Sequence, residues 1–394
     1  MTTHVSYCSV CVIPSISAVP VGLEVSEVCG ACINAEQALQ VNWEQRRSML
    51  SELVDNYPNN SNYDVVIGVS GGKDSYFQTH FAVHELGLKP LLVTYHGNNY
   101  LPEGQENLER MRHVFDADHI TVGPSISTLK KMNRIGFRLQ GDMNWHAHCG
   151  IFTVPIQAAI HWGVPLILWG EHGFTNLGGM FTNDDFNEFT FRDRLEHALR
   201  GYDWHNFTDD GLAKLGRLEL GEGLTGKDLQ WGQYPSDNRV VSNGVRGIYL
   251  SNYVPWDGVR NAEIARGYGW EEARKPFART YRRISNLDDM HENGVHDYLK
   301  FVKLGYGRGT DHACKDIRAG RMTREEGVEI VLEYDHVRPT EDLARWLTYV
   351  DISETEFNQV ADSFRDPRVW WIENGRWHKD CIDGKARGFG QVLT

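Results

Sequence analysis

Residues 65–75 carry the strongest indication of the architecture and read Val65-Val66-Ile67-Gly68-Val69-Ser70-Gly71-Gly72-Lys73-Asp74-Ser75. An apolar run that is typical of a buried strand ends in a Ser-Gly-Gly turn, and a helical pattern begins straight afterwards. Glycines let a backbone approach phosphate oxygens closely, and the free N–H groups at the start of a helix point at an anion. The segment therefore predicts a phosphate-binding loop at the carboxyl end of a strand.

The side chains of this loop suit a nucleotide triphosphate. Lys73 supplies a positive charge, and Asp74 is a candidate to hold Mg²⁺ through water. The loop is not a Walker A motif, because the spacing from Gly68 to Gly72 is one residue too short and Asp74 stands where that motif has a hydroxyl residue. We predict that the ATP-binding residues are Ser70, Gly71, Gly72, Lys73, Asp74 and Ser75.

Apolar runs on both sides of the loop repeat the same pattern. Four of them predict buried parallel strands, at 65–69, 91–95, 119–122 and 166–169. Helical stretches lie between them, at 75–86, 103–115, 125–137 and 151–162, and a further helix is expected at 42–56. Strands that alternate with helices of this length indicate an α/β fold with a doubly wound parallel sheet.

The pattern divides the chain of 394 residues into three predicted parts. Residues 1–40 are too few to bury a core and are expected to need a metal. Residues 41–262 form the α/β domain, in which a long irregular insertion at about 172–262 is expected to contact substrate. Residues 263–394 are expected to be mainly helical, with capping-box patterns beginning at Thr323 and Ser353.

Four of the seven cysteines lie in two Cys-x-x-Cys pairs near the start of the chain, Cys8, Cys11, Cys29 and Cys32. This spacing is typical of a structural zinc ribbon, in which four thiolates complete a closed tetrahedral site. A closed site has no open position for water, so we expect it to serve stability or partner docking. A pair of redox-active dithiols is the alternative.

The composition of the chain argues against binding to nucleic acid or to a membrane. The formal net charge is −13, with no basic run, which disfavours binding to nucleic acid or to an anionic membrane. The apolar runs are too short to span a membrane, and the first Lys or Arg is Arg46, so a secretory signal is not indicated. We predict a cytoplasmic protein.

The loop resembles the PP-loop of the adenine-nucleotide alpha-hydrolase enzymes, whose signature is Ser-Gly-Gly-x-Asp-Ser. With the cysteine pairs, the chain is similar over nearly its whole length to the N-acetyl sugar amidotransferase family of bacterial surface-polysaccharide biosynthesis. Further matching segments lie at 42–44, 46–47, 150–157, 168–171, 298–301, 316–320 and 323–327. The most distinctive one reads Gly305-Tyr306-Gly307-Arg308-Gly309-Thr310-Asp311-His312-Ala313.

The resemblance implies a reaction and its participants. ATP would adenylylate an acetamido group on a nucleotide-linked diacetamido sugar, and ammonia would then replace AMP to give an acetamidino group, with pyrophosphate as the other product, in O-antigen or other surface-polysaccharide biosynthesis. The family also implies ammonia from a separate glutaminase and a cyclase-like barrel. This chain has no evident glutaminase signature of its own. The cofactors expected are ATP, Mg²⁺ and a structural Zn²⁺.

One motif departs from the family pattern. Family members commonly carry Trp-His-Cys-His-x-Gly, whereas this chain has Ala147 at the cysteine position and Cys149 two residues later. A cysteine mechanism is therefore not carried over. His146 and His148, expected just before a helix, are candidates for proton transfer or sugar binding. Glu171 follows a predicted strand and is a candidate base or Mg²⁺ ligand at the carboxyl edge of the sheet.

The late glycine-rich block offers candidates for substrate binding. Arg308 could bind a phosphate through two hydrogen bonds, with Asp311 and His312 beside it. Arg282 and Arg283 are weaker phosphate candidates, because adjacent arginines usually form a solvated face.

Two other functions stay open. A PP-loop tRNA thiolase would use Cys149 or Cys314 as a sulfur carrier and would need a basic face for tRNA. A non-catalytic ATP-binding subunit would use the zinc knuckle to dock a partner enzyme. Replacing Lys73 separates an enzyme from a scaffold, because only the enzyme should lose AMP production.

Overall fold

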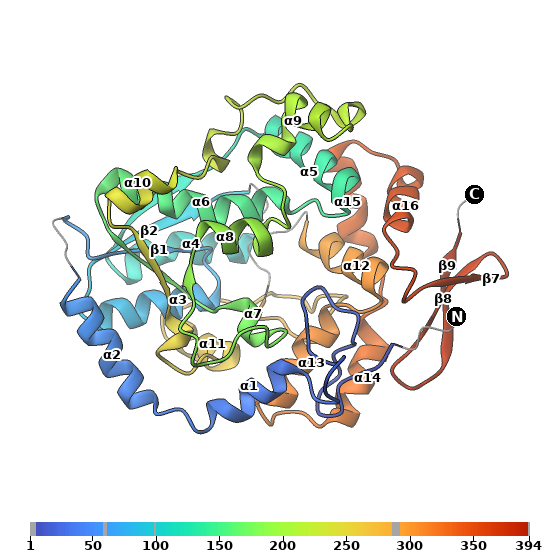
Figure 1. The fold of residues 1–394 in the computed structure, drawn as a ribbon, viewed down its shortest axis with the longest axis horizontal. Coiled ribbons are helices and arrows are strands. Elements are labelled where there is room, and N and C mark those ends of the chain that lie inside the picture. Colours follow the sequence, from blue (N-terminus) through green and yellow to red (C-terminus); the bar gives the residue numbers. More distant parts are fainter. Residues whose placement is uncertain (1–4, 58–60, 98–99, 286–291, 393–394) are drawn as a thin grey trace.

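The computed structural model describes residues 5–57, 61–97, 100–285 and 292–392. A six-stranded sheet in the order β3-β2-β1-β4-β6-β5 forms the centre of the larger part, and the C-terminal helices pack beside it (Figure 1). The strands are β1 (Val65–Gly68), β2 (Pro90–Tyr95), β3 (Asp118–Val122), β4 (Leu166–Trp169), β5 (Glu188–Phe189) and β6 (Arg246–Tyr249). All pair in parallel except β5, which joins the edge antiparallel to β6.

Helices cover both faces of this sheet. One face packs on α3 (Lys73–His80), α4 (Pro102–Val114) and α11 (Gly258–Arg266), and the other on α5 (Ile126–Gln140) and α6 (Trp145–Trp162). Along β1 the side chains alternate, so that Val65 and Ile67 join the first core and Val66 the second. β1, β2 and β4 are buried on both faces and read as continuous apolar runs, which is why the sequence predicted them. The strand predicted at 119–122 is present as β3, but it lies at the edge of the sheet and is half-buried or exposed, so its predicted burial was wrong. The predicted doubly wound α/β fold is confirmed.

Helix α6 begins earlier than the sequence indicated. It starts at Trp145 rather than Ile151, so His146 and His148 lie in its first turn and not before it. The start is fixed by the turn before it, where the Asp142 carboxylate accepts the Asn144 N–H at 2.9 Å. The Trp145 ring then stacks on Phe207 with ring centroids 3.7 Å apart. Tertiary packing therefore outweighs the poor helix propensity of this segment.

The irregular stretch at 172–262 contains short elements and the strand β6, which the sequence did not predict. The helices are α7 (Gly173–Asn176), α8 (Phe191–Asp193), α9 (Asp209–Lys214) and α10 (Asp237–Ser242). A buried Arg194 holds the segment against α6, because its guanidinium donates to the Thr153 hydroxyl at 3.1 Å and to Asp203 at 2.9 Å.

The C-terminal part contains helices and a small sheet. The helices are α12 (Asn293–Leu304), α13 (Arg308–Arg318), α14 (Arg324–Tyr334), α15 (Thr340–Val350) and α16 (Glu354–Ser363). The predicted capping box at Thr323 opens α14. An antiparallel sheet of β7 (Trp371–Glu373), β8 (Arg376–Asp380) and β9 (Ala386–Gln391) ends the described chain and was not predicted. Its short, mostly exposed strands carry no buried apolar run that would mark them.

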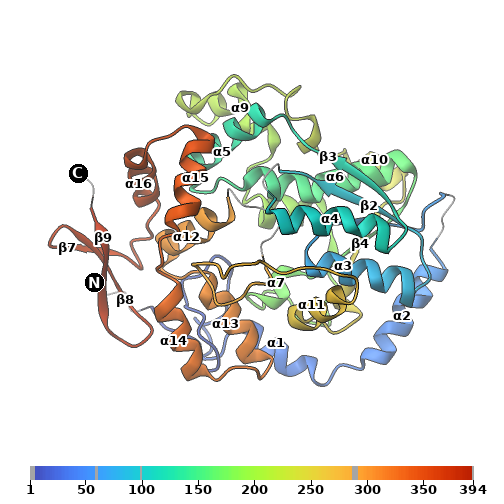
Figure 2. The same ribbon diagram turned by 180° about the vertical axis from the view of Figure 1, so that it is seen from behind.

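The N-terminal segment does not stand apart from the rest. Its cysteines form one apolar cluster with residues of α13 and α14, and it continues into α1 (Gly30–Ala38) and α2 (Trp43–Asp55) (Figures 1 and 2). The Tyr306 hydroxyl contacts the Ser17 hydroxyl and accepts the Ala18 N–H, both at 2.9 Å. No helix in the described residues is long and apolar enough to cross a membrane.

Candidate active site

The phosphate loop follows β1 at the carboxyl edge of the sheet and is held on three sides. The Thr94 hydroxyl donates to the Val69 carbonyl at 2.6 Å, and the Ser70 N–H donates to the Ser75 hydroxyl at 3.0 Å. Gly71 turns the chain with φ +76°, and a Cβ there would lie 2.7 Å from the Leu108 backbone nitrogen. Only glycine fits that position, so the loop conformation is fixed by its sequence.

Lys73 and Asp74, the first residues of α3, form an ion pair at 2.7 Å. The other Asp74 oxygen accepts the Asn261 amide N–H at 2.7 Å, which ties the loop to α11. Burial disfavours the charged Asp74, but Lys73 and the Asn261 hydrogen bond more than offset this and lower the pKa of Asp74. The carboxylate is therefore ionised at neutral pH, as a cation ligand must be.

Two adjoining cavities open from this loop. Cavity A, of about 430 Å³, is bordered by the loop, the ends of β2 and β4, and the start of α6, including Ser70, Asp74, Ser75, Tyr95, His146, His148, Glu171 and Glu292. Cavity B, of about 440 Å³, lies between the loop and α13, and its lining includes Lys73, Asp74, Glu171, Arg282, His312, Lys315, Arg318 and Arg321. Asp74, Glu171 and Trp256 border both cavities, so the cavities adjoin at these residues.

Glu171 lies directly after β4, where the sequence predicted it. The Lys315 ammonium of α13 donates to both Glu171 oxygens, at 3.2 and 3.1 Å. Lys315 therefore brings a cation from the C-terminal part to the edge of the α/β sheet. The cations around cavity B give it a lining that suits phosphate, although Arg282 is already paired with Asp316 at 2.6 Å.

His146 is fully buried and has both ring nitrogens engaged. Its Nδ1 contacts the Tyr95 hydroxyl at 2.9 Å, and its Nε2 lies 3.0 Å from both oxygens of Glu292. Asn133 donates to Glu292 at 2.8 Å and accepts from the Trp346 indole at 2.9 Å. His146 therefore borders cavity A with both ring nitrogens already paired, to Tyr95 and Glu292, and the sequence reasoning missed both of these partners.

His148 points to a different set of neighbours. Its Nε2 lies 4.0 Å from Asp142, and Asp142 in turn contacts Nδ1 of His296 at 3.0 Å. Burial, with a smaller opposing effect of Asp142, lowers the pKa of His148 to about 4. The imidazole of His148 is therefore neutral at pH 7, and the structure separates it from the His146 network.

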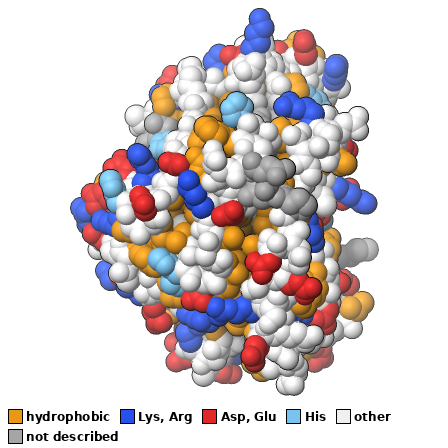
Figure 3. All heavy atoms as spheres, turned by 90° about the vertical axis from the view of Figure 1, so that its left-hand side faces the viewer, with side chains coloured by type: hydrophobic (Ala, Val, Ile, Leu, Met, Phe, Trp, Pro, Cys, Tyr) orange, Lys and Arg blue, Asp and Glu red, His pale blue; other side chains and the backbone are white. Residues whose placement is uncertain are grey.

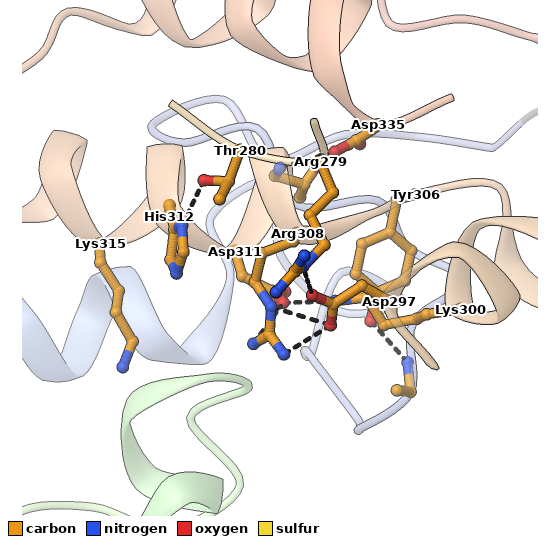
Figure 4. Close-up of polar contacts among 12 residues, drawn as sticks. Arg279, Thr280, Asp297, Lys300, Tyr306, Arg308, Asp311, His312, Lys315 and Asp335 are labelled. Atoms are coloured by element: carbon orange, nitrogen blue, oxygen red, sulfur yellow. Dashed lines mark hydrogen bonds and ion pairs between the residues drawn. The ribbon is translucent and has the colours of Figure 1, made fainter. Parts of the chain in front are cut away.

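Of the predicted substrate ligands in the glycine-rich block, one borders a cavity and two form ion pairs away from both cavities. His312 borders cavity B, and its Nδ1 contacts the Thr280 hydroxyl at 2.6 Å. Arg308 points instead to Asp297, with Nη2 at 2.6 Å from one carboxylate oxygen, and also faces Asp311 (Figure 4). Neither Arg308 nor Asp311 is among the lining residues of cavities A and B, so the structure does not bring these two predicted substrate ligands to the loop.

Cys149 lies buried beneath the irregular segment. An Arg194 nitrogen lies 3.3 Å from its Sγ, and burial raises the pKa of the thiol to about 11. A thiol that stays protonated and covered is poorly suited to carry sulfur. Ala147, which stands at the family's cysteine position, borders cavity A.

The four N-terminal cysteines come together as predicted. All are buried, and their sulfur atoms lie within 4.8 Å of one another, with 3.7 Å between Cys11 and Cys29 and 4.0 Å between Cys8 and Cys32. Tetrahedral zinc with bonds of about 2.3 Å would hold its sulfurs roughly 3.8 Å apart. The Cys11 and Cys29 N–H groups donate to Sγ of Cys8. The four residues therefore fit a closed metal centre.

Charge on the molecular surface is mixed where it can be seen. On the face shown in Figure 3, acidic and basic side chains lie interspersed among apolar and neutral ones. The expectation that the chain does not bind nucleic acid stays a prediction.

Residues 259–381, from α11 to the end of β8, match the family described as "LPS biosynthesis protein WbpG-like, C-terminal domain". This match confirms, over the C-terminal part of the chain, the predicted resemblance to the N-acetyl sugar amidotransferase family. No curated protein matches the chain.

Three solved structures show partial likeness. An NH3-dependent NAD synthetase from Campylobacter jejuni is 13% identical, with a TM-score of 0.28, over 52% of this chain and 92% of that one. An NMN synthetase from Francisella tularensis is 15% identical, with a TM-score of 0.26, over 59% and 96%. The U34-tRNA thiolase NcsA from Methanococcus maripaludis, with its [4Fe-4S] cluster, is 14% identical, with a TM-score of 0.29, over 80% and 85%. At TM-scores this low, none of the three supports a conclusion about this chain.

Proposed function

We propose that this protein is an ATP-dependent N-acetyl sugar amidotransferase, which converts an acetamido group of a nucleotide-linked sugar into an acetamidino group. The observation that carries the proposal is the phosphate loop after β1, which opens into two cavities that share Asp74 and Glu171. The family match, to LPS biosynthesis proteins, supports a sugar substrate.

The first step activates the amide. The acetamido oxygen attacks the α-phosphorus of ATP, the bond from that phosphorus to the β-phosphate oxygen breaks, and pyrophosphate leaves. Lys73, Lys315 and the N–H groups at the start of α3 would balance the negative charge of the phosphates. An amide oxygen is a poor leaving group, whereas the adenylylated oxygen departs as AMP.

The second step forms the new carbon–nitrogen bond. The lone pair of ammonia attacks the activated carbon, a base takes one proton, and the carbon–oxygen bond to AMP breaks to leave the amidine. Glu171 is the candidate base, because it borders both cavities beside the loop. His148 and the Tyr95–His146–Glu292 network border cavity A, where the sugar would lie.

The cofactors follow from the donor sets. Asp74 offers carboxylate oxygens that suit Mg²⁺, which would neutralise the phosphates of ATP. The four cysteines would hold Zn²⁺ as a structural ion. We also propose that ammonia comes from a separate glutaminase with a cyclase-like subunit.

The rival functions fit the site less well. A thiolase needs an accessible, reactive cysteine, but Cys149 is buried with a raised pKa and Cys314 is packed in the apolar cluster around the metal centre. A non-catalytic scaffold would not need the carboxylates and cations that border cavities A and B beside the loop. The cysteines pack against α13 and α14, but residues 9–10 and 24–27 of the knuckle are exposed, so the knuckle does not separate the two functions.

The test is release of AMP and pyrophosphate from ATP and Mg²⁺, with excess ammonium and a panel of diacetamido nucleotide sugars. We expect AMP only when the right sugar is present, and a product lighter by the difference between oxygen and an NH group. Lys73→Ala should abolish AMP release, whereas Lys214→Ala, at an exposed position on α9, should leave it unchanged.

Other results would redirect the assignment. AMP release that does not depend on a sugar would favour the thiolase. No AMP with ammonium or with a glutaminase partner would favour the scaffold, provided that the protein is folded.

A further inference from the structure

We propose that Asp142, His148 and His296 bind one divalent transition-metal ion, at a site separate from the four-cysteine centre and bordering cavity A. The three side chains come from different elements: the turn before α6, the first turn of α6, and α12. One ligand atom from each lies within 4.8 Å of the others. The fold therefore brings His296, which lies far along the chain, to Asp142 and His148.

Hydrogen bonds join only part of this cluster. One Asp142 oxygen lies 3.0 Å from Nδ1 of His296, whereas the other lies 4.0 Å from Nε2 of His148, which is too long for a hydrogen bond. An ion with bonds of about 2.0–2.2 Å holds its donor atoms roughly 3–4 Å apart. Both separations fall in this range, although they involve different Asp142 oxygens, and one ligand atom from each residue lies within 4.8 Å of the others.

The donor types indicate the class of metal. Two imidazoles and one carboxylate suit zinc, manganese, iron, cobalt or nickel, whereas Mg²⁺ prefers oxygen ligands alone. Three protein ligands also leave coordination positions for water or substrate. Asp142 is held in place by the Asn144 N–H, at 2.9 Å, and its side chain is only 4% exposed.

Positively charged side chains near the cluster repel a metal cation and weaken its binding. Lys303 of α12 donates to the Gly141 carbonyl at 2.9 Å and acts electrostatically on Asp142, and Arg200 acts on His148. Attraction by net charge is therefore weak here, and direct coordination must supply the binding energy. This again favours a transition metal with nitrogen ligands over Mg²⁺.

The position of the ion suggests its use. His148 borders cavity A together with Asn144, Glu171 and the phosphate loop. An open coordination position on this side would accept an oxygen of the sugar substrate. That role rests on the proposed function, whereas binding of the metal itself does not.

Metal binding is tested on the full chain without an affinity tag. The chain is stripped with a chelator, reloaded with Co²⁺ alone, and measured by mass spectrometry for cobalt and by absorption. Cobalt on four thiolates gives a strong charge-transfer band, and cobalt on nitrogen and oxygen gives only weak visible bands. We expect one cobalt ion beyond the amount that the thiolate band accounts for.

Variants assign that ion to its ligands. His296→Ala and Asp142→Asn should each lower its affinity by roughly 100-fold or more, since even indirect partners of a metal are worth about 10–100-fold. The thiolate band should persist in both, which shows that the variants are folded. His161→Ala, on the same helix but outside the cluster, should bind cobalt like the wild type.

Two results would overturn the proposal: no cobalt beyond the thiolate centre in the wild type, or wild-type affinity in both variants. Neither measurement uses ATP or a sugar. Failure of the metal site is therefore distinguishable from failure of the amidotransferase assignment.

Discussion

Glu171 is the residue on which the proposed chemistry depends most directly. Glu171→Gln keeps the shape of the side chain but removes its charge, so it can neither accept a proton nor balance Lys315. We expect the rate of sugar-dependent AMP formation to fall roughly 100-fold or more, the usual worth of a general base. Initial rates at saturating ATP and ammonium measure the effect.

The control for this substitution is Glu219→Gln, which removes a carboxylate of an exposed ion pair with Arg217. It should leave the rate within about twofold of the wild type. If Glu171→Gln were equally active, Glu171 would be only the ion-pair partner of Lys315, and another group would take the proton.

His119 helps to support the phosphate loop, and its protonation makes the stability of the fold depend on pH. Its Nε2 lies 2.8 Å from the Thr94 hydroxyl, which holds the Val69 carbonyl. Burial, with a smaller effect of Arg112, lowers the pKa of His119 to about 4. The unfolded chain, with an ordinary histidine pKa of about 6.5, binds the proton more readily, so stability is lost as pH falls from about 6.5 toward 4.

Urea unfolding at different pH values measures this loss of stability. Between pH 7 and pH 5, His119 should lower the free energy of unfolding by at most about 2 kcal/mol, and by less if solvent reaches the ring. His119→Gln should show a smaller decrease over the same interval, because glutamine does not titrate. An identical decrease in both proteins would mean that His119 is not buried enough to resist protonation.

At the scale of elements, the turn between β1 and α3 offers a matched pair of glycines. Gly71 has φ +76°, and an added Cβ would meet the Leu108 backbone. Gly72 has φ −73°, and its added Cβ would meet only the Ser70 hydroxyl, at 3.3 Å. Gly71→Ala should therefore lower the free energy of unfolding by at least roughly 1–2 kcal/mol, because alanine is strained in the left-handed backbone conformation. Gly72→Ala should lower it by less.

Urea unfolding of the two variants measures this difference, and nucleotide binding reports whether the loop keeps its shape. Equal stability of Gly71→Ala and Gly72→Ala would show that the turn relaxes without strain.

The four-cysteine cluster supports an element that reaches the candidate active site. The four cysteines pack with Ala313 and Cys314 of α13, the helix that carries His312 and Lys315 into cavity B. Removing the metal by chelation should speed hydrogen exchange in residues 7–34 and in α13, because burial of four thiols without an ion leaves this cluster unsupported. Exchange in β1 and β2 should stay slow. Uniformly slow exchange would show that the apolar contacts suffice without metal.

The sequence predicted these elements unequally, for physical reasons. β1, β2 and β4 are apolar on both faces and stand out as continuous runs, but β6 reads Arg246-Gly247-Ile248-Tyr249 and becomes a strand through pairing with β4. The phosphate loop and the cysteine pairs were found because their residues are close in sequence. Glu292 and His296 were not found. Folding brings each of them to a residue far away in the sequence, His146 or Asp142, and a single distant residue leaves no spacing pattern to recognise.

Across the whole molecule, packing connects the parts that the sequence divided. Phe137 and Met143 of the α/β part share a core with Val295, Leu343, Trp346 and Phe357 of the C-terminal helices. The Asn133 amide bridges Glu292 and the Trp346 indole. The predicted boundary near residue 262 therefore passes between segments that bury apolar surface against each other, which raises the question of whether each can fold alone.

We expect that a fragment of residues 263–394 does not fold by itself. Without the N-terminal cysteines, α13 and α14 lose the partners of their apolar cluster, and α12 and α15 lose Phe137. Such a fragment should keep helical signal in the far-ultraviolet but lack near-ultraviolet signal from fixed aromatic rings, as molten states do. Mixing it with residues 1–262 should restore that signal if the interface drives the folding of both. A cooperative unfolding transition in the isolated fragment would instead establish the C-terminal part as an independent domain, and the contacts through Asn133 would then be a docking interface between two stable units.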